Sequence, residues 1–144
     1  MTARTILLVE DNPQDEMLIL RALRKAQVAN RIEVARDGQE AVDYLFSRAD
    51  RPAGAEDGLP AVVLLDLNLP RLSGLEVLDR LRADPRTALL PVAILTSSDE
   101  ESDRISSYRN GANSFVRKPV DFPQFAETVS RLGIYWMLIN DPPR

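Results

Sequence analysis

The sequence predicts an α/β fold in which a doubly wound, five-stranded parallel sheet is covered by helices on both faces. Three short runs are almost continuously apolar and rich in Ile, Val and Leu, as buried parallel strands are: 5–9, 61–65 and 92–95. Helical patterns separate the strand candidates, so that strand and helix alternate about five times. This alternation is typical of a single open α/β domain, here spanning 1–144.

Two weaker strand candidates complete the sheet. Residues 31–35 alternate polar and apolar side chains, which is the pattern of a half-covered edge strand. Residues 114–116 form a fifth candidate that is too short to show a period. We therefore expect three central strands and two outer ones.

The helical patterns begin with residues whose side-chain oxygens can accept hydrogen bonds from the free amides of a first turn. Asn12 followed by Pro13 begins the first helix, and Asp37 begins the second. Capping-box spacings mark the other three starts: Ser73 with Glu76, Ser98 with Glu101, and Asp121 with Gln124. The fourth helix, 99–110, is the least apolar and is expected to be the most mobile.

Composition excludes several classes of function. The chain has neither cysteine nor histidine, which removes disulfides, thiol nucleophiles and imidazole chemistry. The net charge of −4 argues against nucleic-acid binding, which relies on clustered Lys and Arg. No apolar run approaches the roughly 20 residues of a membrane-spanning helix, and the first residues do not resemble a signal peptide. A cytoplasmic protein is the resulting expectation.

Polar side chains occur where the expected strands end. Glu10 and Asp11 follow the first strand, Asp66 the third, Thr96 the fourth, and Lys118 the fifth. The carboxyl ends of parallel strands share one edge of the sheet, and ligands of open α/β sheets bind there. We therefore expect these side chains to form one site.

Three carboxylates without a histidine form an oxygen-only pocket, which suits Mg²⁺ and does not suit zinc or copper. A phosphoryl group on Asp66 could then be met by the metal, by Lys118 and by the hydroxyl of Thr96. Taken singly, Glu10 and Asp11 could be a helix cap, and Thr96 and Lys118 ordinary strand-end and surface residues. Asp66 is harder to explain without a function, because it closes an apolar run.

The sequence resembles the receiver domains of response regulators over about residues 5–140. The resemblance rests on five segments: Val-Glu-Asp-Asn at 9–12, Leu-Leu-Asp-Leu-Asn-Leu-Pro at 64–70 with Gly74, Leu-Thr-Ser at 95–97, Gly-Ala at 111–112, and Lys-Pro at 118–119. It implies a flavodoxin-like strand order 2-1-3-4-5. It also implies a signalling switch that accepts a phosphoryl group from a sensor histidine kinase and is not an enzyme for external substrates.

Carried over position by position, the resemblance makes Asp66 the phosphoacceptor. It places Asp11, Asp66 and the main-chain carbonyl of Asn68 on Mg²⁺, with Glu10 holding the metal through water. Lys118 would pair with the phosphoryl oxygens.

Three further positions receive roles from the same resemblance. Thr96 would turn toward the phosphoryl group as the switch residue. Phe115 holds the position of the coupled aromatic residue, where tyrosine is common. Pro119 would follow a cis peptide bond.

A narrower resemblance concerns the small single-domain regulators associated with phytochrome-type histidine kinases. It rests on the long loop before Ala61, the helix start at 121–125 and the apolar ending at 135–140. The chain closes at 141–144 without a linker or a DNA-binding region. Output is therefore expected through protein–protein contacts of the receiver itself.

The sequence leaves two alternatives to a phosphorylated switch. An aspartate-based phosphohydrolase of the haloacid dehalogenase kind needs a second aspartate two residues beyond the nucleophile, where this sequence has Asn68. A pseudo-receiver scaffold typically lacks an acidic-pocket residue or the lysine, and neither is missing here. Turnover of an external phosphoester would support the first alternative.

The C-terminal helix and apolar tail, 122–140, predict a homodimer. One stripe at three- and four-residue spacing can cover the sheet: Phe122, Phe125, Val129, Leu132 and Trp136. Further apolar residues lie at other angles: Tyr135, Met137, Leu138 and Ile139. Such surface is seldom left in water, so a second copy is expected to cover it. The alternative is a tail that folds back on its own domain.

Overall fold

The computed structural model describes residues 5–25, 31–52, 57–97, 111–112, 114–119, 123–124 and 127. The described strands and helices follow one another in this order: β1 (Ile6–Val9), α1 (Pro13–Lys25), β2 (Ile32–Ala35), α2 (Gly38–Arg48), β3 (Val62–Asp66), α3 (Gly74–Ala83), β4 (Val92–Thr96) and β5 (Ser114–Arg117). The five strands are parallel and stand in the order β2-β1-β3-β4-β5. The predicted flavodoxin-like α/β fold is confirmed.

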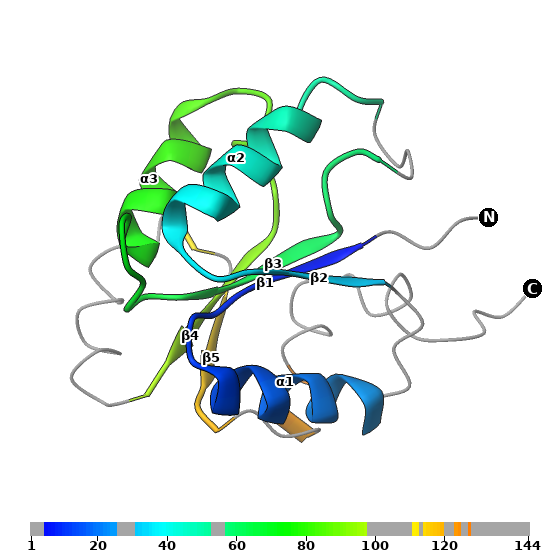
Figure 1. Cartoon of the computed structure of the whole chain (residues 1–144). Coiled ribbons are helices and arrows are strands. Elements are labelled where there is room, and N and C mark those ends of the chain that lie inside the picture. Colours follow the sequence, from blue (N-terminus) through cyan, green and yellow to red (C-terminus); the bar gives the residue numbers. More distant parts are fainter. Residues whose placement is uncertain are drawn as a thin grey trace, which may run out of the picture.

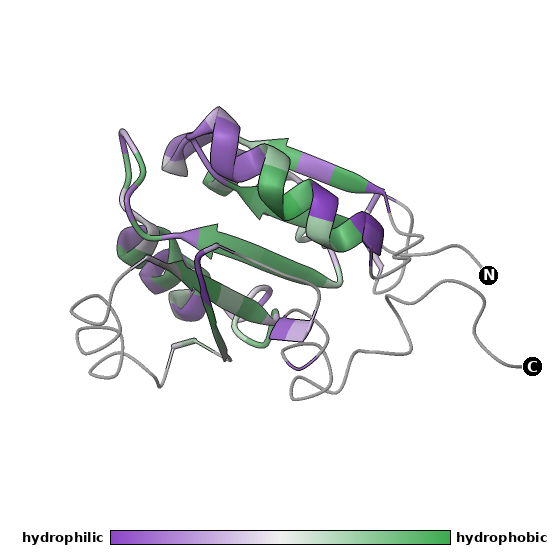
Figure 2. Cartoon of the chain, turned by 90° about the horizontal axis from the view of Figure 1, so that it is seen from below, coloured by the Kyte–Doolittle hydropathy of each residue, from purple (hydrophilic) through white to green (hydrophobic). Residues whose placement is uncertain are grey.

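Helices cover both faces of the sheet. α1 lies on one face, and α2 and α3 lie together on the other (Figure 1). Alternate residues of β1 point to opposite faces: Ile6 and Leu8 pack with Leu23 of α1, whereas Leu7 and Val9 join the core under α2 and α3. Figure 2 shows mostly hydrophobic strands beside helices of mixed hydropathy. Burial on both faces explains why the central strands are continuous apolar runs in the sequence.

The strand ends differ slightly from the expectation. β2 is an edge strand whose first three residues are half-buried, as the alternating pattern predicts. β3 and β4 extend one residue beyond the expected ends, to Asp66 and Thr96, and β5 extends to Arg117. Asp66 pairs with Leu95 of β4 in the sheet register. The acidic residue is thus held by the sheet itself instead of following it in a loop.

Three of the predicted helix starts are confirmed by their hydrogen bonds. The Asn12 side chain accepts from the amides of Gln14 and Asp15 at 2.9 and 3.0 Å and begins α1. Asp37 accepts from the amide of Glu40 and begins α2. Ser73 begins α3 with a complete capping box. These caps fix where each helix starts beside the carboxyl edge of the sheet.

Two predicted segments are largely outside the described residues. The fourth helix, 99–110, lies there entirely. Of the C-terminal helix and tail, 122–140, only positions 123–124 and 127 are described, and they are helical. Within the described ranges, each helix is too short or too polar to cross a membrane.

Candidate functional site

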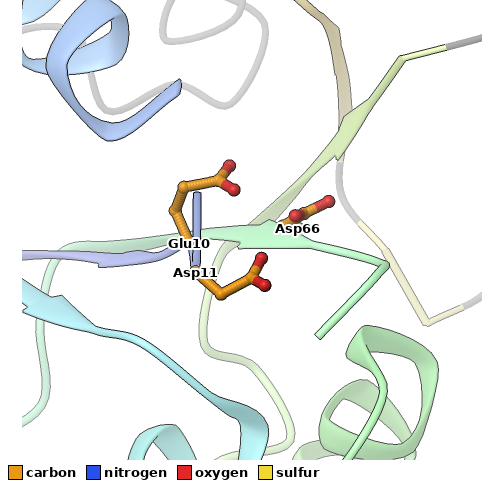
Figure 3. A group of neighbouring side chains, drawn as sticks. All are labelled: Glu10, Asp11 and Asp66. Atoms are coloured by element: carbon orange, nitrogen blue, oxygen red, sulfur yellow. The ribbon is translucent and has the colours of Figure 1, made fainter. Parts of the chain in front are cut away.

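Three carboxylates meet at the carboxyl ends of β1 and β3. Oxygen atoms of Glu10, Asp11 and Asp66 all lie within 4.8 Å of one another, and Figure 3 shows the three side chains gathered around one space. Glu10 and Asp66 are buried, whereas Asp11 is exposed. Three negative charges so close together repel one another unless a cation lies among them.

Lys118 supplies one such positive charge. Its ammonium nitrogen lies 2.9 Å from Glu10 Oε1 and 3.3 Å from Asp66 Oδ2, and its side chain is 13% exposed. The peptide bond from Lys118 to Pro119 is cis, as the resemblance implies. Burial alone would lower the pKa of Lys118, but its contacts with the surrounding carboxylates raise that pKa above its usual range. The lysine therefore remains a permanent cation.

Glu10 is the most enclosed member of the cluster. Its side chain is fully buried, and Oε2 accepts a hydrogen bond from the amide of Asn12 at 3.2 Å. Oε1 forms an ion pair with Lys118 but meets no aligned hydrogen-bond donor in the described part of the chain. Burial raises the pKa of Glu10 to about 7, with the nearby charge of Asp66 adding to the shift and Lys118 opposing it.

This raised pKa predicts a pH-dependent cost of folding. Below about pH 4.5 Glu10 is protonated in both the folded and the unfolded chain. Between pH 4.5 and about 7 the folded chain holds the proton more tightly, so stability falls as pH rises through this window. Without divalent cations, Glu10→Gln should therefore be nearly as stable as wild type at pH 4.5 and more stable than wild type at pH 8.

Urea unfolding of both proteins in EDTA at the two pH values measures this difference. Added Mg²⁺ should stabilise wild type more than Glu10→Gln, because the cation favours the charged carboxylate. A wild-type-to-variant difference that stays constant between pH 4.5 and 8 would show that Glu10 does not carry the pH dependence.

The position of Asp66 depends on the close approach of α3. A Cβ atom on Gly74 would lie 2.2 Å from the carbonyl oxygen of Asp66 and 2.7 Å from Cα of Leu67, so only glycine fits. The amide of Gly74 donates to the carbonyl of Leu67 at 2.9 Å. The amide of Asn68 donates to Asp66 Oδ1 at 3.3 Å. The loop after β3 is thereby fixed directly beside the acidic cluster.

The structure thus brings four of the predicted site residues into contact: Glu10, Asp11, Asp66 and Lys118. Thr96 ends β4, the strand next to β3. Phe115 lies in β5, where it is half-buried against the core under α2 and α3.

Sequence reasoning missed Asp15. Its carboxylate oxygen Oδ2 lies 3.1 Å from the ammonium of Lys118. The sequence does place Asp15 in the first turn of α1, three residues after the capping residue Asn12. This position keeps Asp15 near the end of β1 and could have indicated that it lies close to the site.

The donor set fits a hard divalent cation. Its side-chain donors are all oxygens, and Glu10 Oε1 has a lone pair to offer to a metal-bound water. The exposed Asp11 opens the cluster to solvent, from which a hydrated ion can enter. Mg²⁺ and Mn²⁺ both suit such a site.

The model of the response regulator receiver domain matches residues 6–130 of this chain. The chain belongs to this family. Receiver domains partner with histidine kinases in two-component signalling and are typically signalling modules, not enzymes. The acidic cluster and Lys118 lie within the matched residues.

Two solved structures and one curated relative are similar over most of their lengths. The bacteriophytochrome response regulator AtBRR is 51% identical, with a TM-score of 0.85 and coverage of 98% of this chain and 100% of its own. RtBRR, also a bacteriophytochrome response regulator, is 47% identical with a TM-score of 0.85, covering 99% and 85%. The probable methanogenesis regulatory protein FilR2 of Methanothrix harundinacea is 41% identical, covering 96% and 86%.

Three other similar structures contain a phosphoryl group or a divalent cation. RcpA, a cyanobacterial phytochrome response regulator, was solved phosphorylated; it is 34% identical, with a TM-score of 0.71 and coverage of 94% and 95%. Response regulator Rcp1 was solved with Mn²⁺ bound, at 30% identity, a TM-score of 0.69 and coverage of 98% and 99%. The receiver domain of the Pseudomonas aeruginosa kinase PA1611 coordinates Mg²⁺ in its active-site cleft, at 27% identity, a TM-score of 0.71 and coverage of 92% and 99%.

Proposed function

We propose that this receiver domain is a phosphorylation-dependent switch in which Asp66 accepts a phosphoryl group from a sensor histidine kinase with Mg²⁺ bound beside it. The observation that carries the proposal is the buried carboxylate of Asp66 within an oxygen-only cluster, with the ammonium of Lys118 3.3 Å away. A nucleophile, a metal site and a fixed cation are together what aspartyl phosphorylation requires.

The proposed reaction transfers a phosphoryl group from a histidine of the kinase to Asp66. A carboxylate oxygen of Asp66 attacks the phosphorus of the kinase phosphohistidine, the P–N bond breaks, and the imidazole leaves as a neutral ring whose other nitrogen already carries a proton. Asp11, Asp66 and the Asn68 carbonyl would hold Mg²⁺, with Glu10 holding it through water; the bound ion supplies charge neutralisation at the phosphoryl oxygens. Lys118, whose ammonium lies 3.3 Å from Asp66 Oδ2, would neutralise another phosphoryl oxygen.

Transmission of the signal is proposed to use Thr96 and Phe115. Thr96 ends the strand beside Asp66 and is assigned the hydroxyl that turns toward the phosphoryl group. Phe115 pairs with Ile94 in the adjoining strand, so a change at the end of β4 can reach its ring. The output then passes to another protein through the surface of the receiver.

A phytochrome-type kinase is the proposed phosphoryl donor. The support is the similarity to two bacteriophytochrome response regulators over nearly the whole chain, at 47% and 51% identity. An autophosphorylated kinase of this type, mixed with the purified chain and Mg²⁺, should lose its label to the chain, and EDTA should block the transfer. If the kinase fails but a small phosphodonor labels the chain, the choice of donor is wrong. If neither labels it, the switch itself is wrong.

A homodimer through the C-terminal helix and tail, 122–140, is proposed on the sequence pattern of that segment. Sedimentation of the full chain should give a dimer, and a chain ending at Leu132 should be mostly monomeric, because it lacks the apolar residues 135–139. A full chain that stays monomeric at high micromolar concentration contradicts the dimer. A truncated chain that dimerises equally well contradicts the assigned interface.

A further inference from the structure

Lys118 contacts a third carboxylate that the proposed phosphotransfer does not use. Its ammonium lies 3.1 Å from Asp15 Oδ2, in addition to its contacts with Glu10 and Asp66. One cation is thus shared among a buried pair and a partly exposed carboxylate, since the side chain of Asp15 is 35% exposed. The three contacts come from the ends of two strands and the start of a helix.

The local structure fixes Asp15 at this place. Its amide donates to the capping side chain of Asn12 at 3.0 Å, which holds the first turn of α1 beside the end of β1. A negative charge is also favoured in the first turn of a helix. The neighbouring residue Glu16 points elsewhere, because its carboxylate pairs with Arg36 at 3.1 Å. Asp15 is therefore directed to Lys118 by its position on the helix.

The contacts of Lys118 conflict with metal binding. Glu10 and Asp66 belong to the carboxylate cluster proposed for Mg²⁺, and the ammonium lies on both of them. Two cations within a few ångströms repel each other strongly in a partly buried site. The ammonium must loosen its contacts with these carboxylates when the ion enters. Asp15 is the one remaining carboxylate that contacts Lys118 within the described part of the chain.

We propose that Asp15 is a positioning residue that holds the Lys118 ammonium while a divalent cation occupies the cluster of Glu10, Asp11 and Asp66. The inference rests on the proposed Mg²⁺ site and adds a residue that regulates it. With Asp15 present, the lysine keeps a partner at the edge of the site and stays within reach of a phosphoryl group on Asp66. Without Asp15, the lysine is confined to the metal-binding carboxylates and competes with the ion.

A double-mutant cycle with Mg²⁺ as the titrant tests this role. Isothermal titration calorimetry would compare wild type, Asp15→Asn, Lys118→Ala and the double variant at physiological ionic strength. Asp15→Asn should weaken Mg²⁺ binding about three- to tenfold when Lys118 is present. In the Lys118→Ala background the same change should weaken it by less than about twofold, since there is no lysine left to position.

Two further variants separate positioning from bulk charge. Glu16→Gln also removes one negative charge, but from a neighbouring residue that pairs with Arg36 instead of Lys118. It should leave Mg²⁺ affinity within about twofold of wild type. Asp15→Glu keeps a carboxylate with a longer reach and should restore most of the affinity. Equal losses from Asp15→Asn in both backgrounds, or an equal loss in Glu16→Gln, would overturn the proposal.

The outcomes also separate this inference from the proposed function. If wild type binds Mg²⁺ and Asp15→Asn binds it equally well, only the role of Asp15 is wrong. If wild type binds no Mg²⁺, the proposed metal site is wrong and this inference is overturned with it.

Discussion

Asp66→Asn should reduce phosphorylation of the chain to background, whereas wild type should take up one phosphoryl group from acetyl phosphate and Mg²⁺. The amide nearly matches the carboxylate in shape and can still accept the hydrogen bond from the amide of Asn68. It is not a competent nucleophile, however, so the chemical step is lost while the fold is kept. Intact mass measured over time shows whether the added phosphoryl group appears.

A matched control is available on the surface. Asp50 is an exposed aspartate whose side chain pairs with Arg86 away from the site, and Asp50→Asn should be phosphorylated at the wild-type rate. Circular dichroism of each variant establishes that it is folded. Labelling of Asp66→Asn at the wild-type rate would mean that another residue is the acceptor.

Asp11→Ala and Lys118→Ala should fail in different ways. Asp11→Ala removes a proposed ligand, so Mg²⁺ affinity should fall by at least about tenfold and phosphorylation should fall with it. Lys118→Ala removes a cation from the metal-binding carboxylates, so Mg²⁺ affinity should be unchanged or higher. Lys118→Ala should nevertheless be impaired, either in accepting the phosphoryl group or in transmitting the signal after phosphorylation. If the transfer step is affected, its rate should fall by a factor on the order of a hundred.

Calorimetry with Mg²⁺ and phosphorylation at saturating Mg²⁺ separate these two defects. Saturating metal should restore much of the activity of Asp11→Ala and should not restore Lys118→Ala. A Lys118→Ala protein that has lost Mg²⁺ binding but is phosphorylated normally would contradict the assignment of roles.

The fold could be predicted because the central strands are buried on both faces. Ile6–Val9 and Val62–Asp66 are buried along their whole lengths, and their sequences are apolar except for Asp66 at the end of the second strand. The helix caps at Asn12, Asp37 and Ser73 could also be predicted, because their hydrogen bonds join residues close together in the sequence. The exact ends of the strands could not be predicted as well. Asp66 belongs to the sheet because it pairs with Leu95, and a single sequence does not reveal that pairing.

The cluster of Glu10, Asp11 and Asp66 could be predicted because topology alone brings the carboxyl ends of neighbouring parallel strands together. The sequence could not show that Glu10 is fully buried, which depends on packing from several elements and raises its pKa. It also could not show the contact between Asp15 and Lys118, which are 103 positions apart. Such long-range ion pairs follow from the folded arrangement and leave no local pattern.

Borohydride trapping identifies the phosphorylated residue directly. Borohydride reduces an aspartyl phosphate to homoserine, and peptide mass mapping then locates the altered residue. After incubation of wild type with acetyl phosphate and Mg²⁺, homoserine should appear at position 66, where the buried carboxylate of Asp66 lies beside Lys118. Homoserine at Asp11 or another carboxylate, or no trapped product from a fully folded protein, would contradict this prediction.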